Sequence, residues 1–517
     1  MRTSHKYTQE LGTNLTEEER RQYFPGSWEL HTDDPLVVRS IRLEASRLRR
    51  RIAKRPVAKS QSRNKTIRRS VSEKINQRRT RLRHAKKVAR DYLKRRRGAR
   101  VLSFEEKDIK YSLRPSTILD HLVPNRAKKF ETSAIRRKRV SGHVAVELKD
   151  MSFTHNPRET MNRLGQLAEM ETDAFRINID FHDTHCLDVG PYLLLSTIKR
   201  GMPDLFMGGE ISSSMSKVMS ALELDQELGI WVPVPEDMHT DVFPFPVHRR
   251  RESGSSESAT RYIDKQTHEK VAGNLKAAID NWLKITTQKQ LNLKGRRSVY
   301  KLVTETLDNA ERHGDLLEHQ NDGDWIVAGF MAKRGQGDEE YYRCHLAFLS
   351  TGTTISETIQ TTPEPTKSKL KDYVTKHLRQ VGTKAHAAEH LSTVFALQDG
   401  VTRSEAAVHE KRNGTGFQDI LEFYSDLAAQ GAERADASLA IVSGRTCVLC
   451  NTPYMHGVRQ DGEDSEREMW FNEPNTQDLP PDRHNVIELD RCLKGTLISM
   501  AFTLDLDYLE RTVDRAN

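Results

Sequence analysis

Cysteine is scarce in this chain of 517 residues, which holds only five: Cys186, Cys344, Cys447, Cys450 and Cys492. Being few and scattered, they argue against a disulfide framework and favour a reducing cytoplasm. Cys447 and Cys450 form a C-x-x-C pair, but no second pair stands at zinc-ribbon spacing. We therefore expect buried strand cysteines here in preference to a metal or redox site.

Long apolar runs are also missing. No stretch approaches the roughly 18 consecutive apolar residues of a membrane-spanning helix, and charged residues make up 30% of the chain. The first residues, MRTSHKYTQEL, lack the apolar stretch of a signal peptide. We expect a soluble, cytoplasmic protein without membrane contact, whose length suits two or three domains that each bury a core.

Acidic residues are nearly absent from one segment. Residues 47–100 hold 24 Lys and Arg but only two acids, Glu73 and Asp91, which gives a net charge of +22. Because the whole chain carries +9, the remaining 463 residues carry −13. Residues 71–97 contain no Gly or Pro and many helix formers, but too few apolar residues for a core. The pattern predicts a basic, helix-prone arm on an acidic body.

Such an arm favours a nucleic-acid partner, because each phosphate contact releases counterions. Tyr92 is its only aromatic residue, so we predict binding to the backbone of RNA or DNA without base stacking. A solvated charged face and docking on the chain's own acidic body are the alternatives; a membrane surface is disfavoured because no apolar face accompanies the charge. The residues expected to contact phosphates are Arg68, Arg69, Arg78, Arg79, Arg81, Arg83, Lys86, Lys87, Lys94, Arg95, Arg96 and Arg97.

Composition and turn signals divide the chain into six segments. They are a polar N-terminal segment (1–46), the basic arm (47–100), a connector (101–143), an α/β domain (144–235), a linker rich in Pro, Ser and charge (236–262) and a C-terminal domain (263–517). In the α/β domain we expect strands at VAVELKD, FRINIDF and PDLFMGG, with a helix after each. Strands that alternate with helices predict an α/β layer.

The C-terminal domain has helices first and strands later. We expect helices at about 263–285 and 296–313, a hairpin of WIVAGFMAK and YYRCHLAFLS, a long polar, partly helical insertion at 355–412, a helix after NGTG, and strands ASLAIVSG and GTLISMAFTL. This order predicts an α+β sandwich with helices on a mixed, mainly antiparallel sheet. The fold class of the whole chain is therefore α/β and α+β, multidomain.

The predicted helix at 296–313 carries Glu305, Asn309 and His313 at four-residue steps, which place them on one narrow stripe. Apolar residues at helical spacing supply a separate face for a core. The stripe is either the solvated side of an amphipathic helix or part of a site for a metal-bound phosphate ligand.

Two glycine-bearing segments favour the second interpretation. An apolar strand ends in LSTGTTI, which puts Gly352 at a strand-to-loop turn. Some sixty residues later, NGTGF opens a predicted helix, where backbone N–H groups and the helix dipole can bind phosphate. The residues concerned are Asn413, Gly414, Thr415, Gly416 and Phe417.

In this order of motifs the chain resembles the GHKL ATPase family of histidine kinases, type II topoisomerases, MutL proteins, heat-shock chaperones and anti-sigma-factor kinases. The resemblance covers roughly residues 263–505: ETLDNAERHG is similar to the family's N-box, RNGTGF to its later glycine box and LKGTLISMAF to its closing strand. It implies that ATP and Mg²⁺ are bound, with Asn309 on the magnesium and Glu305 polarising water or a hydroxyl. It also implies that His313 and the glycine box line the site, that Thr496 lies near the base, and that the segment between the glycine boxes is an ATP lid.

One departure concerns the first glycine box, which in the family is Asp-x-Gly-x-Gly. Ser350 replaces the Asp that accepts a hydrogen bond from adenine, and Thr354 replaces the second Gly. A neutral acceptor is roughly half as strong as a charged one, so we expect about tenfold weaker binding or a relaxed base preference.

The middle domain (144–235) resembles the STAS fold of anti-sigma-factor antagonists through INIDFHDTHCLDVGPYLLL and the segments DLFMGG and MSALELDQELGI. Members with a phospho-switch carry a Ser after the Asp of this loop, whereas Asp188 is followed by Val189 and Gly190. The resemblance therefore implies a module that docks a protein partner and is not phosphorylated there.

Three functions remain open from the sequence. The first is a bacterial, nucleotide-gated regulator or Mg²⁺-dependent ATPase that also engages nucleic acid. The second is an adaptor that keeps the fold without ATP turnover, and the third is an anti-sigma-type serine protein kinase. Members of the family often form dimers, but no heptad pattern supports a homodimer here.

Overall fold

The computed structural model describes the residues in the following ranges: 116–128, 140–202, 206–232, 242–250, 266–288, 290–314, 324–334, 341–381, 387–398, 401, 420, 438–450, 458–459 and 467–504. The chain divides into two compact units. One comprises 1–114, 127–144 and 171–178, and the other 115–126, 145–170 and 179–517. The basic arm and residues 413–417 lie outside the described residues.

The N-terminal described elements follow the alternating pattern predicted from the sequence. They are α6 (Thr117–Leu122), β1 (Val140–Leu148), α8 (Pro157–Asp173), β2 (Ala174–Phe181), α9 (Gly190–Gly201), β3 (Phe206–Gly208), α10 (Ser213–Ala221) and α11 (Leu224–Leu228). The three strands form a sheet in the order β1-β2-β3. The single helix predicted after β3 is two helices in the structure. Glu223 has φ 59° and ψ 19°, a left-handed conformation that separates α10 from α11.

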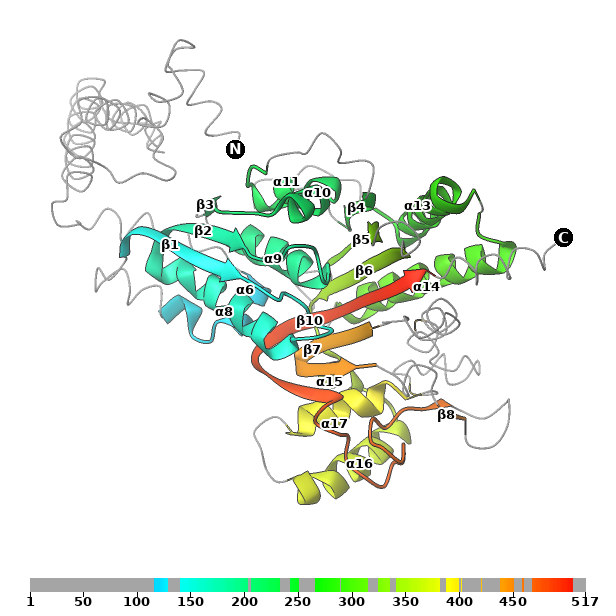
Figure 1. The fold of residues 1–517 in the computed structure, drawn as a ribbon. Helices are drawn as coiled ribbons and strands as arrows, with labels where there is room; N and C mark the ends of the chain where they lie inside the picture. The colour runs from blue at the N-terminus through cyan, green and yellow to red at the C-terminus, as the bar shows by residue number, and fades with distance from the viewer. Residues whose placement is uncertain are drawn as a thin grey trace, which may run out of the picture. The chain divides into compact units, whose positions relative to one another are not determined.

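The second set of elements builds a five-stranded sheet among the described residues, in the order β4-β5-β6-β10-β7 (Figure 1). Its strands are β4 (Val242–Arg249), β5 (Asp324–Arg334), β6 (Tyr341–Thr351), β7 (Ser438–Leu449) and β10 (Val486–Leu504). All four neighbouring pairs are antiparallel. The predicted hairpin and the two late strands are thereby confirmed as secondary structure.

β4 is a difference from the sequence prediction, since residues 242–249 lie in the segment interpreted as a linker. That interpretation rested on the Pro, Ser, Gly and charged residues of the segment, and its Pro244 and Pro246 cannot donate a ladder hydrogen bond. The strand is nevertheless possible because β4 is at the edge of the sheet, paired only with β5 among the described strands.

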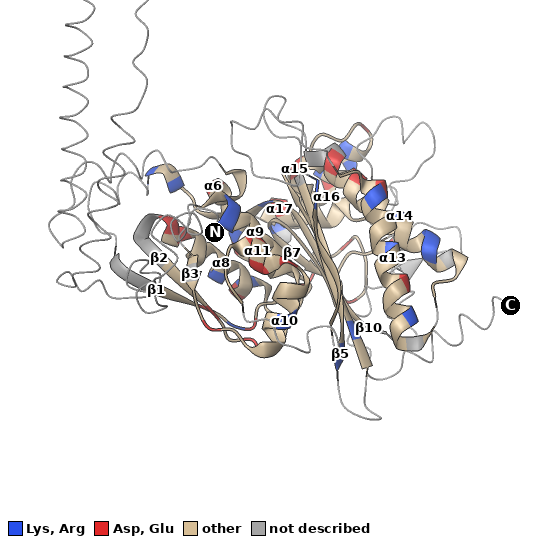
Figure 2. Cartoon of the chain, turned by 90° about the horizontal axis from the view of Figure 1, so that it is seen from above, with Lys and Arg blue, Asp and Glu red and all other residues tan. Residues whose placement is uncertain are grey.

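Helices cover both faces of this sheet (Figure 2). On one face, which we call the α14 face, lie α13 (His268–Thr287) and α14 (Leu293–Gly314), and the two helices pack against each other. On the other, the α9 face, α9 contacts β5, β6 and β10. Burial on both faces explains why β6 and β7 are near-continuous apolar runs and do not alternate with polar residues.

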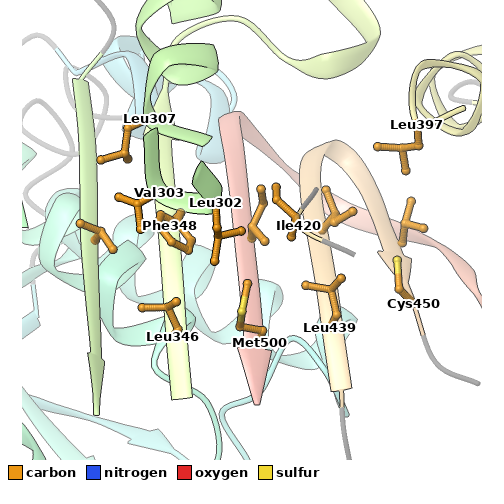
Figure 3. Close-up of a cluster of buried hydrophobic side chains, with 14 of the residues drawn as sticks. Leu302, Val303, Leu307, Leu346, Phe348, Leu397, Ile420, Leu439, Cys450 and Met500 are labelled. Atoms are coloured by element: carbon orange, nitrogen blue, oxygen red, sulfur yellow. The ribbon is translucent and has the colours of Figure 1, made fainter. Parts of the chain in front are cut away.

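The main core lies on the α14 face. Leu302, Val303 and Leu307 of α14 point at Leu346, Phe348 and Met500 of the strands below (Figure 3). Ile420, which is 3% exposed, belongs to the same cluster and lies near Leu439.

The described part of the predicted insertion after β6 is helical, as expected, and it is packed. It contains α15 (Ile355–Ile359), α16 (Thr366–Val381) and α17 (Ala387–Ala396), and α17 contacts β7. Tyr373, Phe395 and Trp470 form its aromatic centre, with Tyr373 and Trp470 ring centroids 5.1 Å apart. The short strands β8 (Val458–Arg459) and β9 (Arg467–Glu468) pair with each other.

Candidate functional site

The polar stripe of α14 lies on one flank of that helix. Leu302, Val303 and Leu307 are buried, while Glu305 and Asn309 are half-buried. Neither Glu305 nor Asn309 has a side-chain hydrogen bond to another of the described residues. The His313 side chain is not among those described.

The opposite flank of α14 carries Glu311, which is tied to the β4 side of the sheet. Its carboxylate accepts a hydrogen bond of 2.8 Å from Trp325 Nε1 and lies 3.4 Å from an Arg250 guanidinium nitrogen. At 100° per residue, Asn309 and Glu311 point about 200° apart. The Asn309 flank therefore faces away from β4, on the side of Leu302, which Figure 3 shows beside β10.

Ser350 and Thr496, predicted from separate motifs, are direct neighbours. Thr496 of β10 pairs with Ser350 of β6 on one side and with Ser443 of β7 on the other, and Ser350 pairs with Trp325 of β5. Directly opposed residues of antiparallel strands point to the same face. Since Trp325 hydrogen-bonds to Glu311 of α14, this row lies on the α14 face.

The three hydroxyl groups of this row are linked by hydrogen bonds. Ser350 Oγ donates to the Thr496 carbonyl at 3.3 Å, and Ser443 Oγ donates to the Gly495 carbonyl at 2.9 Å. Ser443 Oγ and Thr496 Oγ1 are 3.1 Å apart, and Ser443 Oγ also accepts the Ile355 N–H at 2.9 Å. We call Ser350, Thr496 and Ser443 the hydroxyl row.

Two glycines allow the strands to meet closely at this end of the sheet. Gly495 has φ 142°, and a Cβ there would lie 2.0 Å from the Ser350 carbonyl oxygen. Gly352 has φ 130°, and its N–H donates to the Lys494 carbonyl at 3.2 Å. Both positions therefore require glycine.

The loop after Gly352 is fixed by side chains. Thr354 caps α15 in a reciprocal capping box with Glu357, which stabilises the start of that short helix. Lys494 Nζ lies 2.6 Å from Glu357 Oε2 and ties the loop to β10. Thr354, which stands where the family has a second Gly, is thus a helix cap and is buried.

The loop around Asp188, between β2 and α9, is occupied by internal contacts. Asp188 is 1% exposed, and its carboxylate accepts the Phe153 N–H at 2.7 Å and the Gly190 N–H at 2.8 Å. It also accepts a hydrogen bond from Ser499 Oγ on the α9 face of the sheet. Burial raises the pKa of the Asp188 carboxyl. Asp188 therefore joins loop, helix and sheet, and α9 is covered within the chain.

Sequence reasoning missed Ser443, Trp325 and Glu311. Ser443 had a usable signal, because it ends the apolar run LAIV next to Gly444, as Ser350 ends LAFL before Thr351-Gly352. The pairing of Glu311 with Trp325 had none, since it depends on the angle at which α14 crosses β5.

Comparison with known proteins finds no family model, no curated protein and no solved structure that matches this chain. None of the helices within the described ranges is both long and apolar enough to cross a membrane. Among the same residues, no group of three or more His, Cys, Asp and Glu side chains is arranged to hold a metal ion.

Proposed function

We propose that this chain is a cytoplasmic, ATP-binding protein of the GHKL type, in which a STAS-like α/β domain precedes the nucleotide-binding sandwich. The observation that carries the proposal is a shared location. The free flank of α14, with Glu305 and Asn309, and the hydroxyl row lie on the same face of one sheet. A site between them has phosphate-side groups on the helix and base-side groups on the strands.

Magnesium fits the helix side of this site. Mg²⁺ is usually held by one or two protein oxygens together with phosphate oxygens and water. Asn309 offers such an oxygen, half-buried and without a partner among the described side chains. The ion would neutralise phosphate charge, and Glu305, one turn earlier, would orient and polarise the attacking water.

The remaining predicted residues keep the roles that the resemblance to the GHKL family implies. Thr496 and Ser350 would meet the base, with Gly352 at the adjoining turn. The glycine box 413–417 and His313 would contact phosphates. In support, Ile420 stands four residues after Gly416 and belongs to the same core cluster as Leu302, Val303 and Leu307 of α14.

Two further partners belong to the proposal. The basic arm (47–100) would bind the backbone of RNA or DNA. A protein partner would dock on the STAS-like domain, and since α9 is buried, on a surface other than α9. Closure of the nucleotide site would then change how arm and module engage these partners.

Titration of the full chain with Mg-ATP by calorimetry tests the site. Wild type should bind, Asn309→Ala should bind at least about tenfold more weakly because phosphate-bound magnesium loses a ligand, and Glu305→Ala should bind ATP like wild type without hydrolysing it. Asn274→Ala, the same change on the exposed side of α13, should bind like wild type.

The outcomes separate the alternatives. No binding by wild type rejects the nucleotide site and leaves the adaptor, whereas binding that Asn309→Ala leaves intact rejects the site assignment. Phosphate appearing on serine of an added partner protein, and not as free phosphate, identifies the kinase.

A further inference from the structure

The hydroxyl row has a fixed hydrogen-bond polarity. Each hydroxyl has one proton to donate and two lone pairs to accept with. Ser443 accepts the Ile355 N–H, and its own proton goes to the Gly495 carbonyl. Its 3.1 Å contact with Thr496 Oγ1 therefore needs the Thr496 proton, which fills the second lone pair of Ser443.

The same count applies to the other two members. Ser350 donates its proton to the Thr496 carbonyl. Thr496 donates its proton to Ser443. All three protons are thus used inside the protein, and what Ser350 and Thr496 can offer to a ligand is lone pairs only.

We propose that Ser443 makes the hydroxyl row an acceptor-only surface that selects a nucleotide base with an exocyclic amino group. This rests on the proposed nucleotide site. The row then replaces the family's carboxylate with two neutral acceptors, so that adenine is read by its amino group although no acid is present. The carbonyl oxygen of a 6-oxo purine would face these lone pairs with no proton between them, which is unfavourable. Ser443 acts as a positioning residue, because it meets Thr496 and not the base.

ATP and inosine triphosphate form a suitable pair of probes, since inosine triphosphate has an oxo group in place of the amino group at position 6 and carries a proton on the neighbouring N1. In calorimetry of the full chain with Mg²⁺, wild type should prefer ATP by about 10- to 100-fold. This is the range expected when a buried acceptor is left without a hydrogen-bond donor. In Ser443→Ala, the Thr496 hydroxyl can turn and donate, so the preference should fall below about threefold, mainly through tighter inosine triphosphate binding.

Two variants serve as controls. Thr496→Val keeps the shape but removes the hydroxyl, and should weaken ATP binding without weakening the binding of inosine triphosphate. Ser438→Ala is the same change as Ser443→Ala on the same strand, but on the α9 face, where the Ser438 hydroxyl has no hydrogen-bond partner among the described residues. It should keep the wild-type preference.

Circular dichroism establishes whether each variant is folded. Equal binding of both nucleotides by wild type overturns the inference, as does a full ATP preference retained by folded Ser443→Ala; should that variant not fold, a full preference retained by Thr496→Val overturns it. If wild type binds neither nucleotide, the proposed function fails and this assignment fails with it. Binding of ATP without discrimination leaves the proposed function standing and rejects only the role of Ser443.

Discussion

His345 is a titratable side chain enclosed in the sheet. It is 3% exposed, its ring stacks on Phe330 with centroids 4.6 Å apart, and neither ring nitrogen has a hydrogen-bond partner in the described part of the chain. Burial lowers the pKa of His345 well below its usual value, and the positive charges of Arg343 and Arg334 lower it further, with smaller contributions from His185 and His155. The folded protein therefore keeps this imidazole neutral.

Stability should depend on pH through this residue. Below about pH 6.5 the unfolded chain takes up a proton on His345 that the folded chain refuses, so acid favours unfolding by up to about 1.4 kcal/mol per pH unit. The stability that comes from keeping His345 neutral in the fold is fully present above about pH 6.5 and is lost as the pH falls. Urea unfolding between pH 5 and 7.5 should show a smaller loss of stability for His345→Gln than for wild type. His484→Gln, at an exposed histidine, should follow wild type; equal slopes for all three proteins would contradict the prediction.

Residues at the site differ in how far sequence predicts them. Ser350 and Thr496 were predicted from motifs, and the sheet register confirms only that they are neighbours. The polarity of their hydroxyls could not be predicted, because it depends on Ser443 and the Ile355 N–H, which come from two other segments.

At the scale of elements, α9 packs on a row of small residues. Ala347 of β6 pairs with Ala328 of β5 and with Ser499 of β10, and Ser499 pairs with Ala440 of β7. All four are buried on the α9 face. Small side chains bring the helix close to the strands, where Gly190 is so near Ser499 that an added Cβ would lie 3.0 Å from its Oγ.

Enlarging this row should separate helix from sheet. Ala347→Leu adds three carbons to a filled interface and should destabilise the fold by about 1–3 kcal/mol through overpacking. The midpoint of urea unfolding measures the effect. Ala277→Leu, the same change at an exposed position of α13, should stay within about 0.5 kcal/mol of wild type. A fully stable Ala347→Leu would mean that α9 does not lie on these residues.

Most described elements were predictable because their periodicity is local. α14, the β5–β6 hairpin and α9 were all expected, to within a few residues at their ends. β4 was not expected, because its two prolines argue against a strand. The covering of both faces of the sheet by helices was not expected either. Continuous apolar strands indicate two-sided burial but do not say which helix supplies the second cover.

For the molecule as a whole, charge is divided unevenly between arm and body. The arm carries +22 and the rest −13. Polyanions should therefore bind the arm and be repelled by the body, with a strong dependence on salt. The division also makes a test by deletion decisive, because removing the arm reverses the sign of the net charge.

Deleting residues 47–100 should abolish retention on heparin and binding to RNA and DNA at about 0.15 M salt. Fluorescence anisotropy with labelled single- and double-stranded probes over a range of salt concentrations measures the loss. Deleting 1–46, which holds six basic and eight acidic residues, should leave binding unchanged. Unaltered retention without the arm would show that another surface binds polyanions.

The amino-acid sequence by itself determined the order of helices and strands, the charge of each segment and the residue types available at the site, since these follow from periodicity and composition. Only the tertiary structure decided that Thr496 lies between Ser350 and Ser443, that Glu305 and Asn309 face away from β4, and that Asp188 bonds to Ser499. The physical reason is distance along the chain. Pairings between residues 53 to 311 positions apart are set by sheet register and helix packing, which no local pattern encodes.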